Sequence, residues 1–173
     1  MALPKLTPGQ VAQVSLLVAE YIIAQRERFS PQATPLDTAQ KAVVAGFFAR
    51  EALDAARLLV LHGSRIENPS FYPMLGAMGF SNLPDISQMA ATTFCDVVVS
   101  HMPFTDGLLF HEFVHVEQYR QLGIPRFSEL YVRGFLSGGG YDSIPLEANA
   151  YALGRRFEAD PGRRFSVSDE VAR

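Results

Sequence analysis

The segment from Thr105 to Leu122 constrains the fold most, because it is a helix that is apolar on nearly every side. Thr105 can cap its first turn, and Gly123 followed by Pro125 predicts its end. The apolar side chains occur throughout the segment, at Leu108, Leu109, Phe110, Phe113, Val114, Val116 and Leu122. A helix that is hydrophobic all round has to be buried. We therefore expect the rest of the chain to pack around it.

Two histidines and a glutamate stand inside this apolar helix, at His111, Glu112 and His115. The pattern His-Glu-x-x-His places both imidazoles on one face, where they can bind a single metal ion. Glu112 lies beside that position and can take the proton of a water molecule held there. Two neutral imidazoles and a carboxylate are a ligand set that suits Zn²⁺. The alternative is a metal-free helical protein, in which the histidines bond to neighbours and Glu112 pairs with an arginine.

Residues 108–157 resemble the core of the gluzincins, the clan of zinc peptidases that includes thermolysin. The residues that carry this resemblance are His111, Glu112 and His115 on one predicted helix and Glu147 on a later one. The runs 110–119 and 140–151 are also similar to small uncharacterised bacterial zincin-like domains, which contain the same pair of helices. The resemblance implies zinc binding and hydrolysis of a peptide or protein substrate, with Glu112 as the general base.

The third protein ligand of the zinc is predicted at Glu147, in the first turns of the last long helix. In the thermolysin-like pattern a glutamate on a later helix has this role. The 32 residues that separate it from His115 are enough for the chain to return across the first helix. Asp142 is the competing candidate, because some zincins use an aspartate near a glycine and a tyrosine. A pattern with a third histidine ten residues after the first does not apply, since Gln121 occupies that position.

Several residues are candidates for orienting the metal ligands and for binding the substrate. The thermolysin-like pattern has an aspartate four residues after the glutamate ligand, where this chain has Tyr151. The hydroxyl of Tyr151 could orient a metal-bound histidine. The alternative is that Tyr151 only packs against neighbouring side chains. The candidates for stabilising the oxyanion of the transition state are Tyr131, Tyr141, Tyr151 and His101. An extended peptide is expected to add to the strand at Val97–Ser100.

The remaining patterns predict a mainly helical α+β fold with a small sheet before the active-site helix, and the resemblance implies that this is a zincin-like domain. Residues 1–162 are expected to form this single domain and residues 163–173 a polar, mobile tail. β-Branched residues predict one strand over Thr92–Ser100, and a second strand is expected at Arg57–His62. Further helices are expected over residues 7–28, 36–50, 127–136 and 143–158, with a helical turn near residues 72–78 and a stop at residues 138–140.

Composition excludes several classes of protein. The 173 residues carry a net charge of −3 and their basic residues form no stripe, so no nucleic-acid partner is expected. The single cysteine, Cys95, excludes an internal disulfide and a cysteine-based zinc site, and its apolar surroundings predict an inert buried thiol. We see neither a signal peptide nor a membrane-spanning segment, which favours a cytoplasmic protein without a membrane partner.

Two functions therefore remain in competition. The first is a zinc-dependent hydrolase, most simply a peptidase, in which Glu112 activates water. The second is a non-hydrolytic zinc protein, in which the metal joins two helices and the domain binds a partner. Glu112 favours the first, because a purely structural site has no use for a base beside the metal.

Overall fold

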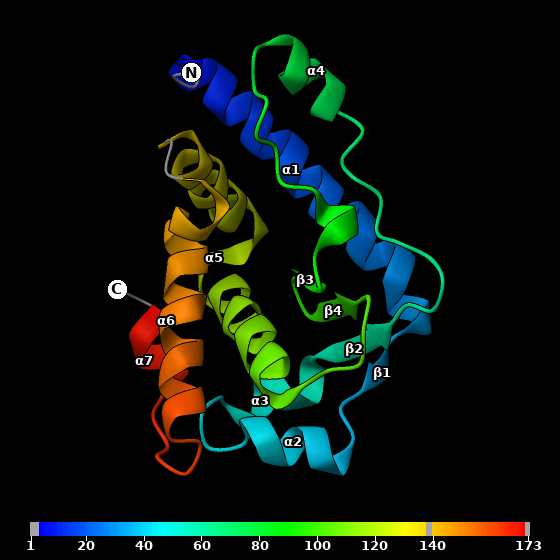
Figure 1. Ribbon diagram of the computed structural model, residues 1–173, viewed down its shortest axis with the longest axis vertical. Helices are drawn as coiled ribbons and strands as arrows, with labels where there is room; N and C mark the ends of the chain where they lie inside the picture. Colours follow the sequence, from blue (N-terminus) through cyan, green and yellow to red (C-terminus); the bar gives the residue numbers. More distant parts are fainter. Residues whose placement is uncertain (1–3, 138–139, 172–173) are drawn as a thin grey trace.

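The structure is a computed structural model that describes residues 4–137 and 140–171. It is a mainly helical α+β fold with one small four-stranded sheet, as the sequence predicts (Figure 1). The helices are α1 (Pro8–Phe29), α2 (Thr38–Val44), α3 (Arg50–Ala55), α4 (Tyr72–Ala77), α5 (Asp106–Leu136), α6 (Pro145–Ala159) and α7 (Val167–Val171). The strands are β1 (Thr34–Pro35), β2 (Arg57–Val60), β3 (Ala91–Phe94) and β4 (Val97–Ser100). Short 3₁₀ turns cover Ser30–Gln32, Ile86–Gln88 and Tyr141–Ser143.

Helix α5 is the centre of the fold, as its apolar composition requires. It packs against α6 on one side and against α1 and β3 on the other (Figure 1). Gly123 interrupts it with a φ of 70°, a conformation that glycine adopts without strain, and Pro125 follows within the next turn. The predicted end at Gly123 is therefore a kink, after which the chain continues as a second arm to Leu136.

Stacked aromatic rings hold α6 against the first arm of α5. The rings of Phe110 and Phe157 lie parallel with centroids 4.4 Å apart. Phe47, from the turn after α2, meets both of them edge-on at 5.2 and 5.4 Å. Offset and edge-to-face pairs of this kind stabilise by about 0.5–1.5 kcal/mol beyond the burial of their area. This aromatic cluster sets the distance between the two helices that carry the candidate site.

The predicted strand at Thr92–Ser100 is in fact a hairpin of β3 and β4. Cys95 takes a left-handed φ of 63° and turns the chain, and Arg26 holds the neighbouring Asp96 through two hydrogen bonds. Cys95 is therefore half-buried in a turn and not buried in a strand, and burial raises the pKa of its thiol.

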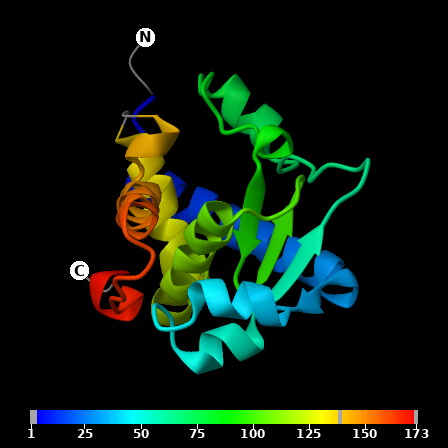
Figure 2. The same ribbon diagram turned by 60° about the horizontal axis from the view of Figure 1, so that its bottom comes forward.

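The four strands form one sheet in the order β1-β2-β4-β3. This sheet lies between the helices, as Figure 2 shows.

This strand order shows that the strand expected to pair with an extended substrate has no free edge. Val97–Ser100, as β4, pairs with β2 in parallel and with β3 in antiparallel fashion, so both of its edges are occupied. An extended peptide cannot add to a strand whose backbone groups already pair on both sides. The edge strand next to α5 is β3.

Two further predictions about the chain were wrong. The helix expected over residues 36–50 is divided, because α2 ends at Val44 and α3 starts only at Arg50. Within the expected polar tail, Val167 is fully buried in the core and its backbone N–H donates to the carbonyl of Phe47. Helix α7 thus belongs to the packed fold. Gly138 and Gly139, which are predicted to end the helix of residues 127–136, lie outside the described residues.

None of the helices in the described part of the chain is long and apolar enough to cross a lipid bilayer.

The close approach of α5 and α6 at Gly134 yields a test of this packing. A Cβ atom at Gly134 would lie 2.6 Å from Cδ of Pro145 and 3.0 Å from Cγ2 of Ile144. We expect Gly134→Ala to lower the free energy of unfolding by about 1–3 kcal/mol, as overpacked cores do. Denaturant-induced unfolding followed by circular dichroism measures this change.

The matched control is Gly154→Ala in α6, where a Cβ would meet nothing within 4 Å. Alanine is the better helix former, so this variant is expected to be as stable as the wild type or more stable by up to about 1 kcal/mol. Equal stability of the two variants would contradict the packing described here.

Candidate metal centre

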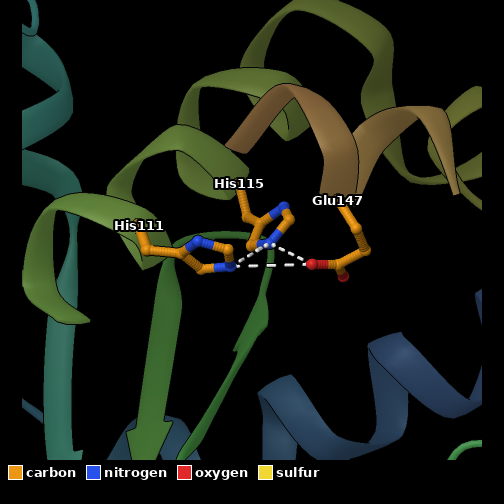
Figure 3. Close-up of side chains that lie close together, drawn as sticks. All are labelled: His111, His115 and Glu147. Atoms are coloured by element: carbon orange, nitrogen blue, oxygen red, sulfur yellow. Dashed lines mark hydrogen bonds and ion pairs between the residues drawn. The ribbon is translucent and has the colours of Figure 1, made fainter. Parts of the chain in front are cut away.

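The site forms where the middle of α5 meets the start of α6. His111 and His115 are four residues apart on α5 and therefore project from one face. Pro145 occupies the first turn of α6, a position that suits its fixed φ and its missing N–H. Glu147 follows in that same turn, where the helix dipole favours a negative charge. Figure 3 shows the three side chains converging on one point.

The three side chains have the spacing of a metal site. Nε2 of His111 and Nε2 of His115 are 3.2 Å apart. Oε2 of Glu147 lies 3.3 Å from Nε2 of His115 and 3.6 Å from Nε2 of His111. Three ligand atoms at tetrahedral angles around a zinc ion are separated by about 3.3–3.4 Å, given bonds of about 2.0–2.1 Å. The observed triangle is therefore the one that a tetrahedral ion would need.

The protein alone leaves part of this triangle unsatisfied. Oε2 of Glu147 is buried and accepts no hydrogen bond. Burial by itself raises the pKa of Glu147, but the attraction of His115 and a hydrogen bond from Tyr141 outweigh it and hold the pKa well below its usual range. Burial lowers the pKa of His115, whereas the carboxylates of Glu147 and Glu112 raise it to about 9. A buried carboxylate oxygen that faces two imidazoles fits a cation between the three groups.

Gln118 fixes the orientation of His115, a role that sequence reasoning did not assign to it. Nδ1–H of His115 donates to Oε1 of Gln118 over 2.8 Å, which leaves Nε2 facing the centre. The amide nitrogen of Gln118 donates to the carbonyl of Leu146 and to Oδ1 of Asn149, both on α6. The signal in the sequence is its position three residues after His115, on the same face of the helix.

Tyr141 supports the third member of the triangle. Its hydroxyl donates to Oε1 of Glu147 over 2.7 Å, so Oε2 is the oxygen that faces the histidines. Burial raises the pKa of Tyr141, which therefore stays protonated and able to donate. This hydrogen bond places Tyr141 as a partner of Glu147, although the sequence suggested it only as a possible oxyanion donor.

The other oxyanion candidates lie in three different environments. Tyr151 packs its ring against His111 with centroids 4.6 Å apart and is partly exposed. Tyr131 lies beside Tyr141, and burial raises its pKa well above the ordinary value. His101 is committed elsewhere, because its Nε2 accepts from a backbone N–H and its Nδ1 contacts a backbone carbonyl at 2.6 Å. His101 therefore holds two loop segments together, and among these three residues Tyr151 is the one whose ring packs against His111.

Glu112 lies buried next to the triangle but is not part of it. The hydroxyl of Thr93, on β3, lies 2.7 Å from Oε2 of Glu112 and orients the carboxylate. Sequence reasoning did not single out Thr93, because its contact spans 19 residues between a strand and a helix. Asp142, the alternative third ligand, is exposed and does not belong to the cluster of His111, His115 and Glu147.

Two spaces meet at the site. One is a cavity of about 90 Å³, lined mainly by aromatic and aliphatic side chains together with Glu112, His115 and Glu147. The other is a groove of about 450 Å³ that reaches His111 and Glu112 from the outside, between α5, α6 and the start of β3. Glu112 and Tyr141 line both spaces. The triangle is thus accessible to a ligand and has an apolar cavity behind it.

Comparison of this chain with models of protein families, with curated proteins and with solved structures found no significant match. The interpretation of the site consequently depends on its own geometry.

The contact between Gln118 and His115 yields a prediction about metal affinity. Replacing Gln118 with leucine removes the acceptor for Nδ1–H of His115 and leaves that group buried without a partner. We expect Gln118→Leu to weaken zinc binding by about 10–100-fold, as is typical when the hydrogen-bond partner of a histidine ligand is lost. Competition with a fluorescent chelator measures the dissociation constant.

Gln121→Leu is the control on the same helix. Its amide contacts Glu117 and Ser168 and no residue of the triangle, so zinc affinity should stay within about threefold of the wild type. If both variants bind zinc like the wild type, Gln118 does not support the metal.

Proposed function

We propose that this protein is a zinc-dependent hydrolase whose substrate is a peptide or protein. The observation that carries the proposal is the triangle of His111, His115 and Glu147 at 3.2–3.6 Å, with the carboxylate of Glu112 beside it. Two imidazoles and one carboxylate are the donor set of catalytic zinc sites that keep one position for water. The groove that reaches this point supports an accessible site over a closed structural one.

Each residue of the site has a separate role in the proposed reaction. A bound zinc ion would polarise the scissile carbonyl and make water acidic enough to lose a proton near neutral pH. Glu112 accepts that proton and later returns it to the leaving amine. Thr93 holds the carboxylate of Glu112 in position through its hydroxyl. Tyr151 lies in the groove next to His111, where its hydroxyl can donate to the oxyanion that develops on the substrate.

The edge strand β3 offers a place for an extended substrate. It pairs with β4 on one side only, and its residues Ala91 and Thr93 line the spaces at the site. Addition of a peptide to a sheet edge gives main-chain hydrogen bonds without regard to sequence. We therefore propose that the peptide pairs with Ala91–Phe94 and not with Val97–Ser100.

The decisive test compares Glu112→Gln with the wild type on a library of quenched fluorescent peptides. Glutamine keeps the size of the side chain and leaves the triangle intact, but it cannot accept the proton of water. We expect zinc to stay bound and hydrolysis to fall by at least about 100-fold. Thr93→Val should lower kcat with zinc retained, whereas Thr92→Val, whose hydroxyl faces Met89, should be close to the wild type.

Two results would contradict the proposal. One is a Glu112→Gln variant that keeps zinc and full hydrolytic activity. The other is a wild-type protein that binds one zinc ion yet cleaves no peptide of the library. The second result would favour the non-hydrolytic protein, in which zinc only joins α5 to α6.

A further inference from the structure

We propose that Arg155 binds a carboxylate group of the substrate and thereby selects peptides that carry a negative charge near the bond to be cleaved. This inference deepens the proposed function and depends on it. Glu147, Tyr151 and Arg155 follow one another at four-residue steps along α6, so they share one face of the helix. Eight residues of helix correspond to about 12 Å, which separates the guanidinium-bearing residue from the metal ligand on that face.

The groove connects these residues on the surface of the molecule. Arg155 lines the same groove of about 450 Å³ as His111, Glu112 and Tyr151. Arg155 and Tyr151 also line an adjoining space of about 330 Å³ next to Asp142. A ligand lying in the groove can therefore contact the metal site at one end and the guanidinium at the other.

The guanidinium of Arg155 is without a partner among the described residues, which is uncommon in this protein. Its neighbour Arg156 pairs with Glu170 and stacks on Phe165 at 3.9 Å. Arg120, Arg126 and Arg133 each pair with a glutamate within four residues on α5. Such surface pairs are worth little energetically, but they occupy the guanidinium.

Besides Glu112, two carboxylates share these spaces with Arg155. Glu158 lines the groove and lies against Gly107 at the start of α5, while Asp142 lines the adjoining space. Neither forms an ion pair with Arg155 within 4.0 Å. Among the residues that the structure describes, Arg155 is the only lysine or arginine that lines the groove. Among the described side chains of the groove, Arg155 therefore carries the one permanent positive charge, and an anionic group on a ligand that extends away from the metal would be attracted to its guanidinium.

The distance specifies which carboxylate fits. An arginine presents a planar fork that matches a carboxylate through two parallel hydrogen bonds. An extended peptide rises by about 3.3 Å per residue, so about 12 Å corresponds to three to four residues from the carbonyl at the metal. A free C-terminal carboxylate or the side chain of an aspartate or glutamate at that distance presents the same chemistry.

Matched peptide hydroxamates test this inference without requiring turnover. The probes are succinyl hydroxamates extended by one to three alanines, which end either in a carboxylate or in a carboxamide. A third series ends in a carboxamide and has an internal aspartate. Isothermal titration calorimetry with the zinc-loaded protein measures each affinity. We expect the best carboxylate probe to bind about tenfold more tightly than its carboxamide, since a charge-assisted pair is lost in the latter.

Three variants assign the difference to its residue. Arg155→Gln should bind both members of the pair with the affinity that the carboxamide has for the wild type. Arg155→Lys should keep part of the preference, because it retains the charge but not the fork. Arg163→Gln is the control, since Arg163 is also exposed and without a side-chain partner among the described residues but lines neither space.

The outcomes separate this inference from the proposed function. Equal affinity for carboxylate and carboxamide, or a preference that survives in Arg155→Gln, would overturn the role of Arg155 even if peptides are cleaved. A preference that disappears only in Arg155→Gln would support it even if no peptide is cleaved, in which case only hydrolysis fails. If no hydroxamate binds to protein that holds zinc, the groove does not lead to the metal and both proposals are overturned.

Discussion

The burial of Glu147 against two imidazoles is the interaction on which the rest of the structure depends. Taking an ionised carboxylate out of water costs several kcal/mol unless opposite charge and hydrogen bonds compensate. Here the start of α6, the hydroxyl of Tyr141 and the pair of histidines supply that compensation, and Oε2 still lacks a hydrogen bond. Only firm packing of α6 on α5 can hold the carboxylate in this position. The stacked rings of Phe110 and Phe157 provide that packing at one end of the contact, and the close approach at Gly134 provides it at the other.

Three side chains around the site each hold a neighbouring functional group in a fixed orientation. Gln118 orients one imidazole, Tyr141 orients the carboxylate of Glu147, and Thr93 orients that of Glu112. Each of these contacts fixes a side chain that would otherwise adopt several rotamers, so the geometry of the triangle is set before any ligand arrives. The groove and the apolar cavity then offer the two sides of the site to different parts of a substrate.

Local sequence patterns were sufficient for the long helices α1, α5 and α6, but neither for the short helices α2, α3 and α7 nor for the contacts between elements. The apolar composition of residues 105–122, the cap at Thr105 and the glycine at 123 are short-range signals, and the structure contains the helix that they predict. The hairpin at residues 91–100 escaped prediction because its turn contains Cys95 in a left-handed conformation, without the glycine or asparagine that normally marks such a turn. Helix α7 escaped prediction because Val167, which anchors it in the core, lies in a mostly polar segment. Thr93 and Gln118 acquire their roles through tertiary contacts, which a periodicity in one segment does not report.

The proposed metal centre depends most directly on the identity of its three ligands, so the zinc affinity of ligand variants tests it most directly. Protein purified without chelator is loaded with zinc and then challenged with a chromophoric chelator, and wild type, Glu147→Ala and Asp142→Ala are compared. We predict one zinc ion per chain in the wild type and in Asp142→Ala, and a loss of affinity of more than about 100-fold in Glu147→Ala, because losing a ligand costs more than losing its hydrogen-bond partner. Retention of zinc by Glu147→Ala with loss in Asp142→Ala, or a wild-type protein that binds no zinc at all, would contradict the account.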